Sequence, residues 1–268
     1  SRPRKSKLPP EIDHTDKATV DWPSMLHSER YKTRLAYLTT ERGLTLDTIK
    51  TYGIGYDGQR YTVPIRSADG VIRNVRKYLH VKNSHKRSAE QQKWLHTAGH
   101  GAPAMVAFTS ELAQNSHAVI FCAGEFDAML TNQRMEGFPV VAVTATGGEG
   151  KVPPYLDDLL SREVFIAYDC DQAGVAGADK LAGALSDRGA NVYTLDLTNL
   201  GLPFGNGADL TDYWMKYGGT PEALLDLMQQ ARSAPTETTD EILAAMEAGF
   251  LELGSPRDDY TPLLLSED

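Results

Sequence analysis

Short apolar runs alternate with amphipathic segments in the second half of the chain. The pattern predicts strands at 118–122, 139–143, 164–168 and 191–195, and helices at 126–136, 153–160, 174–188, 209–217 and 221–232. Strands that alternate with helices form βαβ units, in which successive strands pair in parallel. This half of the chain therefore predicts a mainly parallel sheet flanked by helices.

The first half of the chain has a different pattern. It predicts helices at 28–39 and 45–52, and strands at 61–65 and 71–79 that a Ser-Ala-Asp-Gly turn joins into a hairpin. The segment 80–103 shows little periodicity and predicts a surface loop. We therefore expect an α/β protein in which a smaller mixed α+β subdomain precedes the parallel-sheet domain.

Changes in composition divide the chain into four segments. The first 22 residues are rich in Pro and charge and have no hydrophobic period, which is typical of a linker. The end of the chain is acidic, with one amphipathic helix expected at 240–253. The predicted division is a linker or arm at 1–27, a basic subdomain at 28–115, the parallel-sheet domain at 116–232 and an acidic helical tail or linker at 233–268.

The net charge of −9 averages over two unlike halves. Residues 1–100 carry 19 Lys and Arg against 10 Asp and Glu, whereas residues 101–268 carry 8 against 26. The densest basic stretch, 60–93, holds nine basic and two acidic residues. A basic half joined to an acidic half fits a cleft with one phosphate-binding and one metal-binding wall. The alternative is an ordinary solvated face followed by an acidic tail.

Cysteine content and hydropathy limit the class of protein. The two cysteines, Cys122 and Cys170, do not form a Cys₄ or Cys₂His₂ zinc signature, and a disulfide is not expected. This usage predicts a reducing cytoplasm. No apolar run reaches 18 residues, so we expect no membrane span. No signal peptide is visible, and the absent initiator Met is compatible with a piece of a longer protein.

Acidic residues stand at the ends of predicted strands. Glu125 and Asp127 follow the first strand of the sheet, Asp169 and Asp171 follow the third, and Asp209 closes a Gly-rich loop after the fourth. Ligands bind beyond the carboxyl ends of parallel strands, and carboxylates gathered there repel one another unless a cation lies between them. The pattern therefore predicts a site for Mg²⁺ or Mn²⁺. Alternatively, the Asp-x-Asp pair caps the following helix.

Three motifs together resemble the TOPRIM domain of DnaG-type primases, topoisomerases and some nucleases. Residues 124–128 read Gly-Glu-Phe-Asp-Ala, residues 168–174 read Tyr-Asp-Cys-Asp-Gln-Ala-Gly, and residues 207–213 read Gly-Ala-Asp-Leu-Thr-Asp-Tyr. The resemblance covers 118–232. It implies a catalytic and metal-binding set of Glu125, Asp127, Asp169 and Asp171, with Asp209 as a further metal ligand.

Upstream segments narrow the resemblance to the catalytic core of DnaG-type primases. Residues 38–44 and 52–56 resemble the opening of that core, 64–78 its basic hairpin, and 93–95 the segment that follows. In the family this subdomain contacts the nucleoside triphosphate and the template. The resemblance thus implies five nucleotide- or template-binding residues: Arg66, Arg73, Arg76, Lys77 and Lys93. The alternative is that they are solvated residues at a strand edge.

The first motif departs from the family at one position. Ala123 occupies the place of a Glu that TOPRIM enzymes use as a catalytic acid/base or metal ligand. Three explanations stand: Glu125 takes over its role, the domain is naturally degenerate, or the residue is an inactivating substitution. In the third motif, Ala208 replaces a frequent Lys.

The resemblance implies a DNA primase of phage or mobile-element type, which makes short RNA primers on single-stranded DNA from nucleoside triphosphates with Mg²⁺ or Mn²⁺. A replicative helicase, fused or separate, is an expected partner. The expected location is the cytoplasm at replication sites, which is the host cytoplasm for a phage protein. The alternatives are a metal-dependent TOPRIM nuclease and, because of Ala123, a catalytically degenerate nucleic-acid-binding module.

Overall fold

The computed structural model describes residues 21–67, 70–80, 92–97, 100, 106–107, 116–154 and 156–233. The predicted arm up to residue 20 and the acidic helix at 240–253 lie outside these ranges. The described residues up to Arg232 belong to one compact unit. Within the described ranges, no helix has the length and apolar character needed to cross a bilayer.

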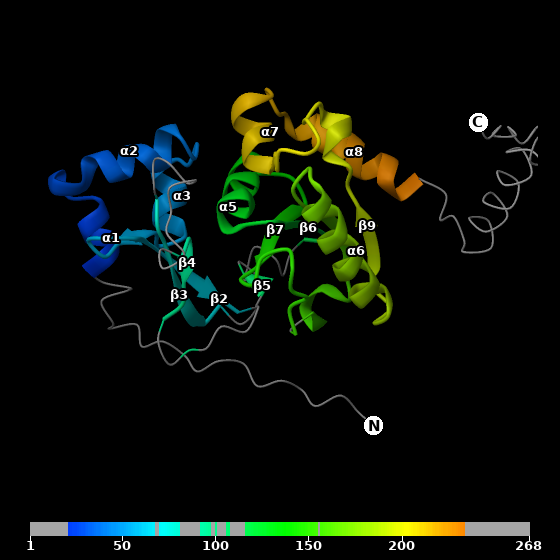
Figure 1. Cartoon of the computed structure of the whole chain (residues 1–268), viewed down its shortest axis with the longest axis horizontal. Helices are drawn as coiled ribbons and strands as arrows, with labels where there is room; N and C mark the ends of the chain where they lie inside the picture. The colour runs from blue at the N-terminus through cyan, green and yellow to red at the C-terminus, as the bar shows by residue number, and fades with distance from the viewer. Residues whose placement is uncertain are drawn as a thin grey trace, which may run out of the picture. The chain divides into compact units, whose positions relative to one another are not determined.

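The first subdomain consists of short helices and an antiparallel sheet in the order β1-β2-β3-β4 (Figure 1). Its elements are α1 (Asp21–Leu26), the 3₁₀ turn η1 (Glu29–Tyr31), α2 (Lys32–Thr40), α3 (Leu46–Thr51), β1 (Gly55–Tyr56), β2 (Tyr61–Arg66), β3 (Ile72–Tyr78) and β4 (Trp94–Leu95). The predicted hairpin is confirmed, because β2 and β3 pair antiparallel, with Tyr61 opposite Tyr78.

Three helices or strands of this subdomain were not predicted, namely α1, β1 and β4. Residues 21–26, assigned to the arm, form α1, whose Leu26 is fully buried. The loop predicted over 80–103 is wrong at Trp94 and Leu95, which form β4 and pair with β3. Two residues are too few to show a strand period. Trp94 also packs 5.9 Å, centroid to centroid, from Phe126 of the second subdomain.

The second subdomain is a five-stranded sheet in the order β5-β7-β6-β8-β9. Its elements are β5 (Val106–Ala107), β6 (Ala118–Cys122), α5 (Glu125–Arg134), β7 (Val140–Ala145), η3 (Asp157–Leu159), β8 (Glu163–Ala167), α6 (Gln172–Ser186), β9 (Asn191–Thr194), η4 (Leu197–Leu200), α7 (Leu210–Lys216) and α8 (Pro221–Ser233). The four strands from β6 to β9 pair in parallel, and β5 is an antiparallel edge. The predicted fold class is confirmed.

One predicted helix of this subdomain is wrong. Among its described residues, 153–154 and 156–160, the segment contains only the 3₁₀ turn η3. Pro153 and Pro154 at its start have no backbone N–H to donate. The apolar residues behind that prediction still serve the core, because Leu156 and Leu159 are buried against one face of the sheet.

Both faces of the parallel sheet are covered. Ile120 and Cys122 of β6 belong to the core shared with α5, α7 and α8, whereas Val119 and Phe121 belong to the core shared with α6. Alternate residues of a strand point to opposite faces, so a strand covered on both sides is a continuous apolar run. This arrangement leaves the carboxyl ends of the strands as the edge where polar side chains gather.

Two glycines of α6 bring that helix against the backbone at this edge. A Cβ atom on Gly174 would lie 2.1 Å from the carbonyl oxygen of Asp169, and one on Gly177 would lie 2.7 Å from the carbonyl oxygen of Glu149. Residues three apart share one face of a helix. The small side chains therefore let a single face of α6 support the backbone that carries two acidic residues.

We expect Gly174→Ala to destabilise the protein by about 1–3 kcal/mol, because its methyl group would collide with backbone that cannot move without displacing Asp169. Gly183→Ala in the same helix is the matched control. Among the described residues, no atom other than those of its chain neighbours and its own helix backbone lies within 4 Å of its added Cβ, so the better helix propensity of Ala should stabilise by about 0.5–1 kcal/mol. Urea unfolding of both variants tests this, and shifts of the same sign would contradict it.

Candidate active site

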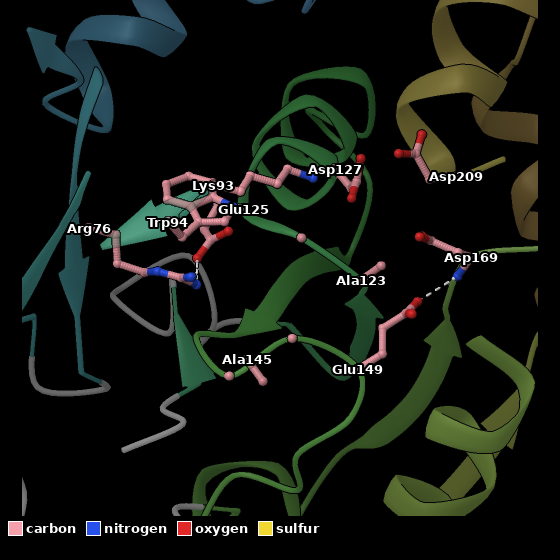
Figure 2. Close-up of a pocket in the computed structure, with 13 residues that line it drawn as sticks. Arg76, Lys93, Trp94, Ala123, Glu125, Asp127, Ala145, Glu149, Asp169 and Asp209 are labelled. Carbon is pink, nitrogen blue, oxygen red and sulfur yellow. Dashed lines mark hydrogen bonds and ion pairs between the residues drawn. The ribbon is translucent and has the colours of Figure 1, made fainter. Parts of the chain in front are cut away.

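A pocket of about 310 Å³ lies beyond the carboxyl ends of β6, β7 and β8 (Figure 2). It brings together six of the residues predicted from sequence: Arg76, Lys93, Glu125, Asp127, Asp169 and Asp209. The acidic members come from the parallel-sheet domain, and the two basic members come from the first subdomain. The pocket thus has the acidic and the basic wall that the charge pattern predicts.

Asp169 lies two residues beyond the end of β8. Its backbone N–H donates a 2.8 Å hydrogen bond to Oε1 of Glu149, while its own Oδ1 is buried without a hydrogen-bond partner among the described residues. Burial raises the pKa of Asp169 to about 8, and repulsion from Glu149, Asp127 and Asp209 acts in the same direction. A buried, unpaired carboxylate oxygen is costly unless a proton or a cation binds it.

Glu125 and Arg76 form a buried ion pair. Their side chains are only 3% and 8% exposed, and the Arg76 guanidinium also lies 4.6 Å from the centroid of the Trp94 ring. Burial raises the pKa of Glu125, whereas the positive charge of Arg76 acts against that shift. The Glu125 carboxylate is therefore already neutralised by a cation of the protein.

Asp127 and Asp209 lie at the beginnings of helices. Asp127, in the first turn of α5, accepts a hydrogen bond from the Thr211 hydroxyl, and burial raises its pKa. Asp209 is the N-cap of α7 and accepts a 2.8 Å hydrogen bond from the Asp212 N–H. Burial, followed by repulsion from Asp127, raises the pKa of Asp209 to about 7. Each carboxylate thus keeps an oxygen that these bonds do not use.

Asp171 has the capping role that was the alternative for the Asp-x-Asp pair. Its Oδ1 accepts a 2.8 Å hydrogen bond from the Gly174 N–H at the beginning of α6. It is not among the residues that line the pocket. The two carboxylates of the motif therefore differ in environment, and only Asp169 faces the pocket.

The predicted phosphate-binding residues also separate into two groups. Lys93 lines the pocket and is directed toward Asp127 (Figure 2). Arg66 donates to the Gly70 carbonyl at the hairpin turn, and Arg73 donates to the Ser67 hydroxyl there. Lys77 forms a 3.0 Å ion pair with Asp57. These three residues, Arg66, Arg73 and Lys77, lie outside the pocket lining.

Sequence reasoning missed Glu149 as a site residue. It was part of a Gly-rich segment, 144–150, and no motif marked it. In the structure its carboxylate lines the pocket beside Ala123 and Asp169 (Figure 2). Burial raises its pKa, the hydrogen bond from the Asp169 N–H opposes this, and Asp171 and Asp209 raise it further. The only signal in the sequence was an acidic residue in a loop after a predicted strand.

Arg42 is a second residue that the sequence did not single out. Its guanidinium donates to the hydroxyls of Tyr37 and Tyr78 and lies 4.7 Å from the centroid of the Phe126 ring. Its positive charge lowers the pKa of Asp127, against the effect of burial. Arg42 therefore links the first subdomain to α5 and offsets part of the negative charge of the pocket.

The carboxylates line one pocket but do not yet converge on one point. Among the described residues, no group of three or more His, Cys, Asp or Glu side chains already surrounds a single metal position. Their pKa values are raised partly by mutual repulsion, which disfavours convergence of ionised groups. Binding of one cation by several of them therefore requires side-chain rotation toward the pocket centre.

We expect the free energy of unfolding of the metal-free protein to fall as the pH rises from about 5 to about 8. The pKa of Asp169 is raised to about 8 and that of Asp209 to about 7, whereas an unfolded Asp titrates near pH 4. The folded state then binds more protons than the unfolded state across this range, so stability is lost with rising pH. Thermal unfolding in EDTA measures this.

The matched control for the pH experiment is Asp169→Asn, which removes the most strongly shifted of the two carboxyls and should flatten the profile. Added Mg²⁺ or Mn²⁺ should restore stability near pH 8, because a cation favours the ionised carboxylates. A melting temperature that stays constant or rises between pH 6 and 8 in EDTA would contradict the prediction.

The chain has the fold of the catalytic cores of DnaG primases. One solved structure that it resembles is the DnaG catalytic core, with a TM-score of 0.58 and 20% sequence identity over 78% of this chain and 76% of that one. Another is a DNA primase domain from Pseudomonas aeruginosa, with a TM-score of 0.59 and 17% identity over 78% of this chain and 75% of that one. A third is the DnaG primase catalytic domain bound to single-stranded DNA, with a TM-score of 0.59 and 17% identity over 87% of this chain and 85% of that one. No protein-family model and no curated protein sequence matches the chain.

Proposed function

We propose that the chain is the RNA-polymerase core of a DnaG-type DNA primase, which joins ribonucleotides into short primers on single-stranded DNA. The observation that carries the proposal is the pocket, where Asp127, Asp169 and Asp209 face Arg76 and Lys93 in a fold shared with DnaG catalytic cores. One of those cores is bound to single-stranded DNA. These features support a nucleotidyltransferase.

The pocket residues fit a hard divalent cation. The donors are carboxylates, and the buried Oδ1 of Asp169 has no hydrogen-bond partner among the described residues. In this proposal Asp169 and Asp209 bind Mg²⁺ or Mn²⁺. Beside them, Asp171 caps α6 and Asp127 of α5 accepts a hydrogen bond from Thr211 of α7. The bound metal would lower the pKa of the attacking 3′-hydroxyl and neutralise charge on the triphosphate.

The protein's own cations would position the triphosphate and the template. Lys93 is the exposed cation of the pocket lining, so we assign it to the triphosphate. In the reaction the 3′-hydroxyl would lose its proton to solvent and its oxygen would bond to the α-phosphorus, while the bond from that phosphorus to the bridging oxygen breaks and pyrophosphate leaves. Arg66, Arg73 and Lys77 lie outside the pocket and are candidates for template phosphates. Arg76 is paired with Glu125. We therefore assign Arg76 primarily to holding the two subdomains together.

The proposal extends to partners and location. The substrates are a single-stranded DNA template and nucleoside triphosphates, and a replicative helicase, fused or separate, is the proposed protein partner. The proposed location is the cytoplasm at sites of DNA replication, which is the host cytoplasm if a phage encodes the chain.

Primer synthesis on single-stranded DNA with labelled nucleotides and Mg²⁺ or Mn²⁺ tests the function. We expect short RNA products. Cleavage of labelled DNA by the protein, with Mn²⁺ present and nucleotides absent, would instead identify a nuclease. DNA binding that persists with all metal chelated, without any product, would identify a binding module.

The affinity for the template should fall as the salt concentration rises, because binding depends on phosphate contacts. Fluorescence anisotropy measures this affinity. An affinity that is unchanged between low and moderate salt would contradict binding through phosphate contacts.

A further inference from the structure

The carboxylates of the pocket are not equivalent. Glu125 is paired with Arg76, and the Lys93 side chain is directed toward Asp127 (Figure 2), which also accepts a hydrogen bond from the Thr211 hydroxyl. The acidic side chains that remain in the lining are Glu149, Asp169 and Asp209. Among the described residues, no Lys or Arg forms an ion pair with any of these three. They are therefore the carboxylates of the pocket left for a cation from solution.

Glu149 is held in a defined position within this group. Its Oε1 accepts the 2.8 Å hydrogen bond from the Asp169 N–H, so its carboxylate is directed at the backbone of Asp169 (Figure 2). Its own backbone packs on Gly177 of α6, where a Cβ atom would lie 2.7 Å from the Glu149 carbonyl oxygen. The side chain is also half-buried. Contacts on both sides thus distinguish Glu149 from a residue of a freely solvated loop.

The segment after the neighbouring strand β6 lacks a carboxylate at the position next to Glu149. Ala123, directly after β6, lines the same pocket as Glu149 and contributes only a methyl group. β6 and β7 are adjacent and parallel, with Cys122 opposite Thr144, so the segments that follow them leave the sheet at the same level. The segment after β7 therefore brings a carboxylate to the part of the pocket where the segment after β6 has none.

We propose that Glu149 binds the divalent cation together with Asp169 and Asp209, and that it supplies the carboxylate that Ala123 does not. The inference rests on the proposed metal-dependent function, because it assigns a ligand of that same site. It also adds a fourth explanation for Ala123: the acidic group has moved to the neighbouring loop, so the site needs neither a new role for Glu125 nor the loss of its function.

Mn²⁺ binding to the full chain, followed by calorimetry and electron paramagnetic resonance without nucleotide or template, tests the proposal. We expect Glu149→Gln to weaken Mn²⁺ binding at least about tenfold. The matched control is Glu136→Gln, an exposed residue beyond the other end of α5, which should bind as the parent does. The double variant Ala123→Glu/Glu149→Gln should recover affinity, because it returns a carboxylate to the adjacent position.

Each outcome decides the assignment. Unchanged Mn²⁺ affinity in Glu149→Gln, or a loss that Ala123→Glu does not recover, overturns it. Absence of any Mn²⁺ binding by the parent chain overturns both this assignment and the metal dependence of the proposed function. Mn²⁺ binding that requires Glu149 in a chain that makes no primers keeps the assignment and rejects the primase. Circular dichroism and thermal unfolding in EDTA confirm that the variants compared are folded.

Discussion

Asp169→Asn is expected to lower primer synthesis about 10²–10³-fold, the range found when one preorganised charge-stabilising group is removed. The substitution keeps the shape of the side chain and the backbone N–H that donates to Glu149. It removes the negative charge of the one acidic residue whose buried oxygen has no partner among the described residues. The loss should therefore come from the metal site rather than from the fold.

The control for this prediction is Asp179→Asn, which makes the same chemical change at an exposed position of α6. Its primer synthesis should stay within about twofold of the parent, as expected for surface substitutions that touch nothing. Product yields from gel assays at several Mn²⁺ concentrations provide the measurement. Equal activity of the two variants would remove Asp169 from the catalytic set.

The sequence located the acidic wall because its signals are local. Asp169 and Asp209 each stand where a short apolar strand or a Gly-rich loop gives way to a helix, and the period of those elements places them at one edge of the sheet. The short apolar runs also predicted a parallel sheet flanked by helices, and both faces of that sheet are covered. These features depend on residues that are close in the chain, so one sequence contains them.

What the sequence did not provide depends on contacts between distant segments. Glu149 approaches Asp169 across 20 residues, and Arg76 pairs with Glu125 across 49. No local pattern distinguishes such a residue from a solvated one, since the partner belongs to another element. The short strand at Trp94 was missed for the same reason, because pairing with β3 defines it. Resemblance placed Arg76 among the phosphate-binding residues, whereas the structure pairs it with a carboxylate.

That pair leads to the prediction with the largest expected effect on stability. Arg76→Met should destabilise the protein by about 3–5 kcal/mol, because it leaves the Glu125 carboxylate buried without a countercharge. Glu125→Gln should also destabilise, since it leaves the Arg76 guanidinium unpaired. The double variant should lose less than the sum of the two, because no uncompensated charge then remains.

Urea unfolding of the parent, both single variants and the double variant forms a double-mutant cycle that isolates the interaction of Arg76 with Glu125. The destabilisation by Arg76→Met should shrink toward acidic pH, because burial raises the pKa of Glu125 and a protonated carboxyl no longer needs the cation. If Arg76→Met is as stable as the parent but binds the triphosphate more weakly, Arg76 is a nucleotide-binding residue, as predicted from the sequence. A large interaction energy would instead mean that this cation serves first to join the basic hairpin to the acidic wall, leaving Lys93 as the pocket's cation for substrate.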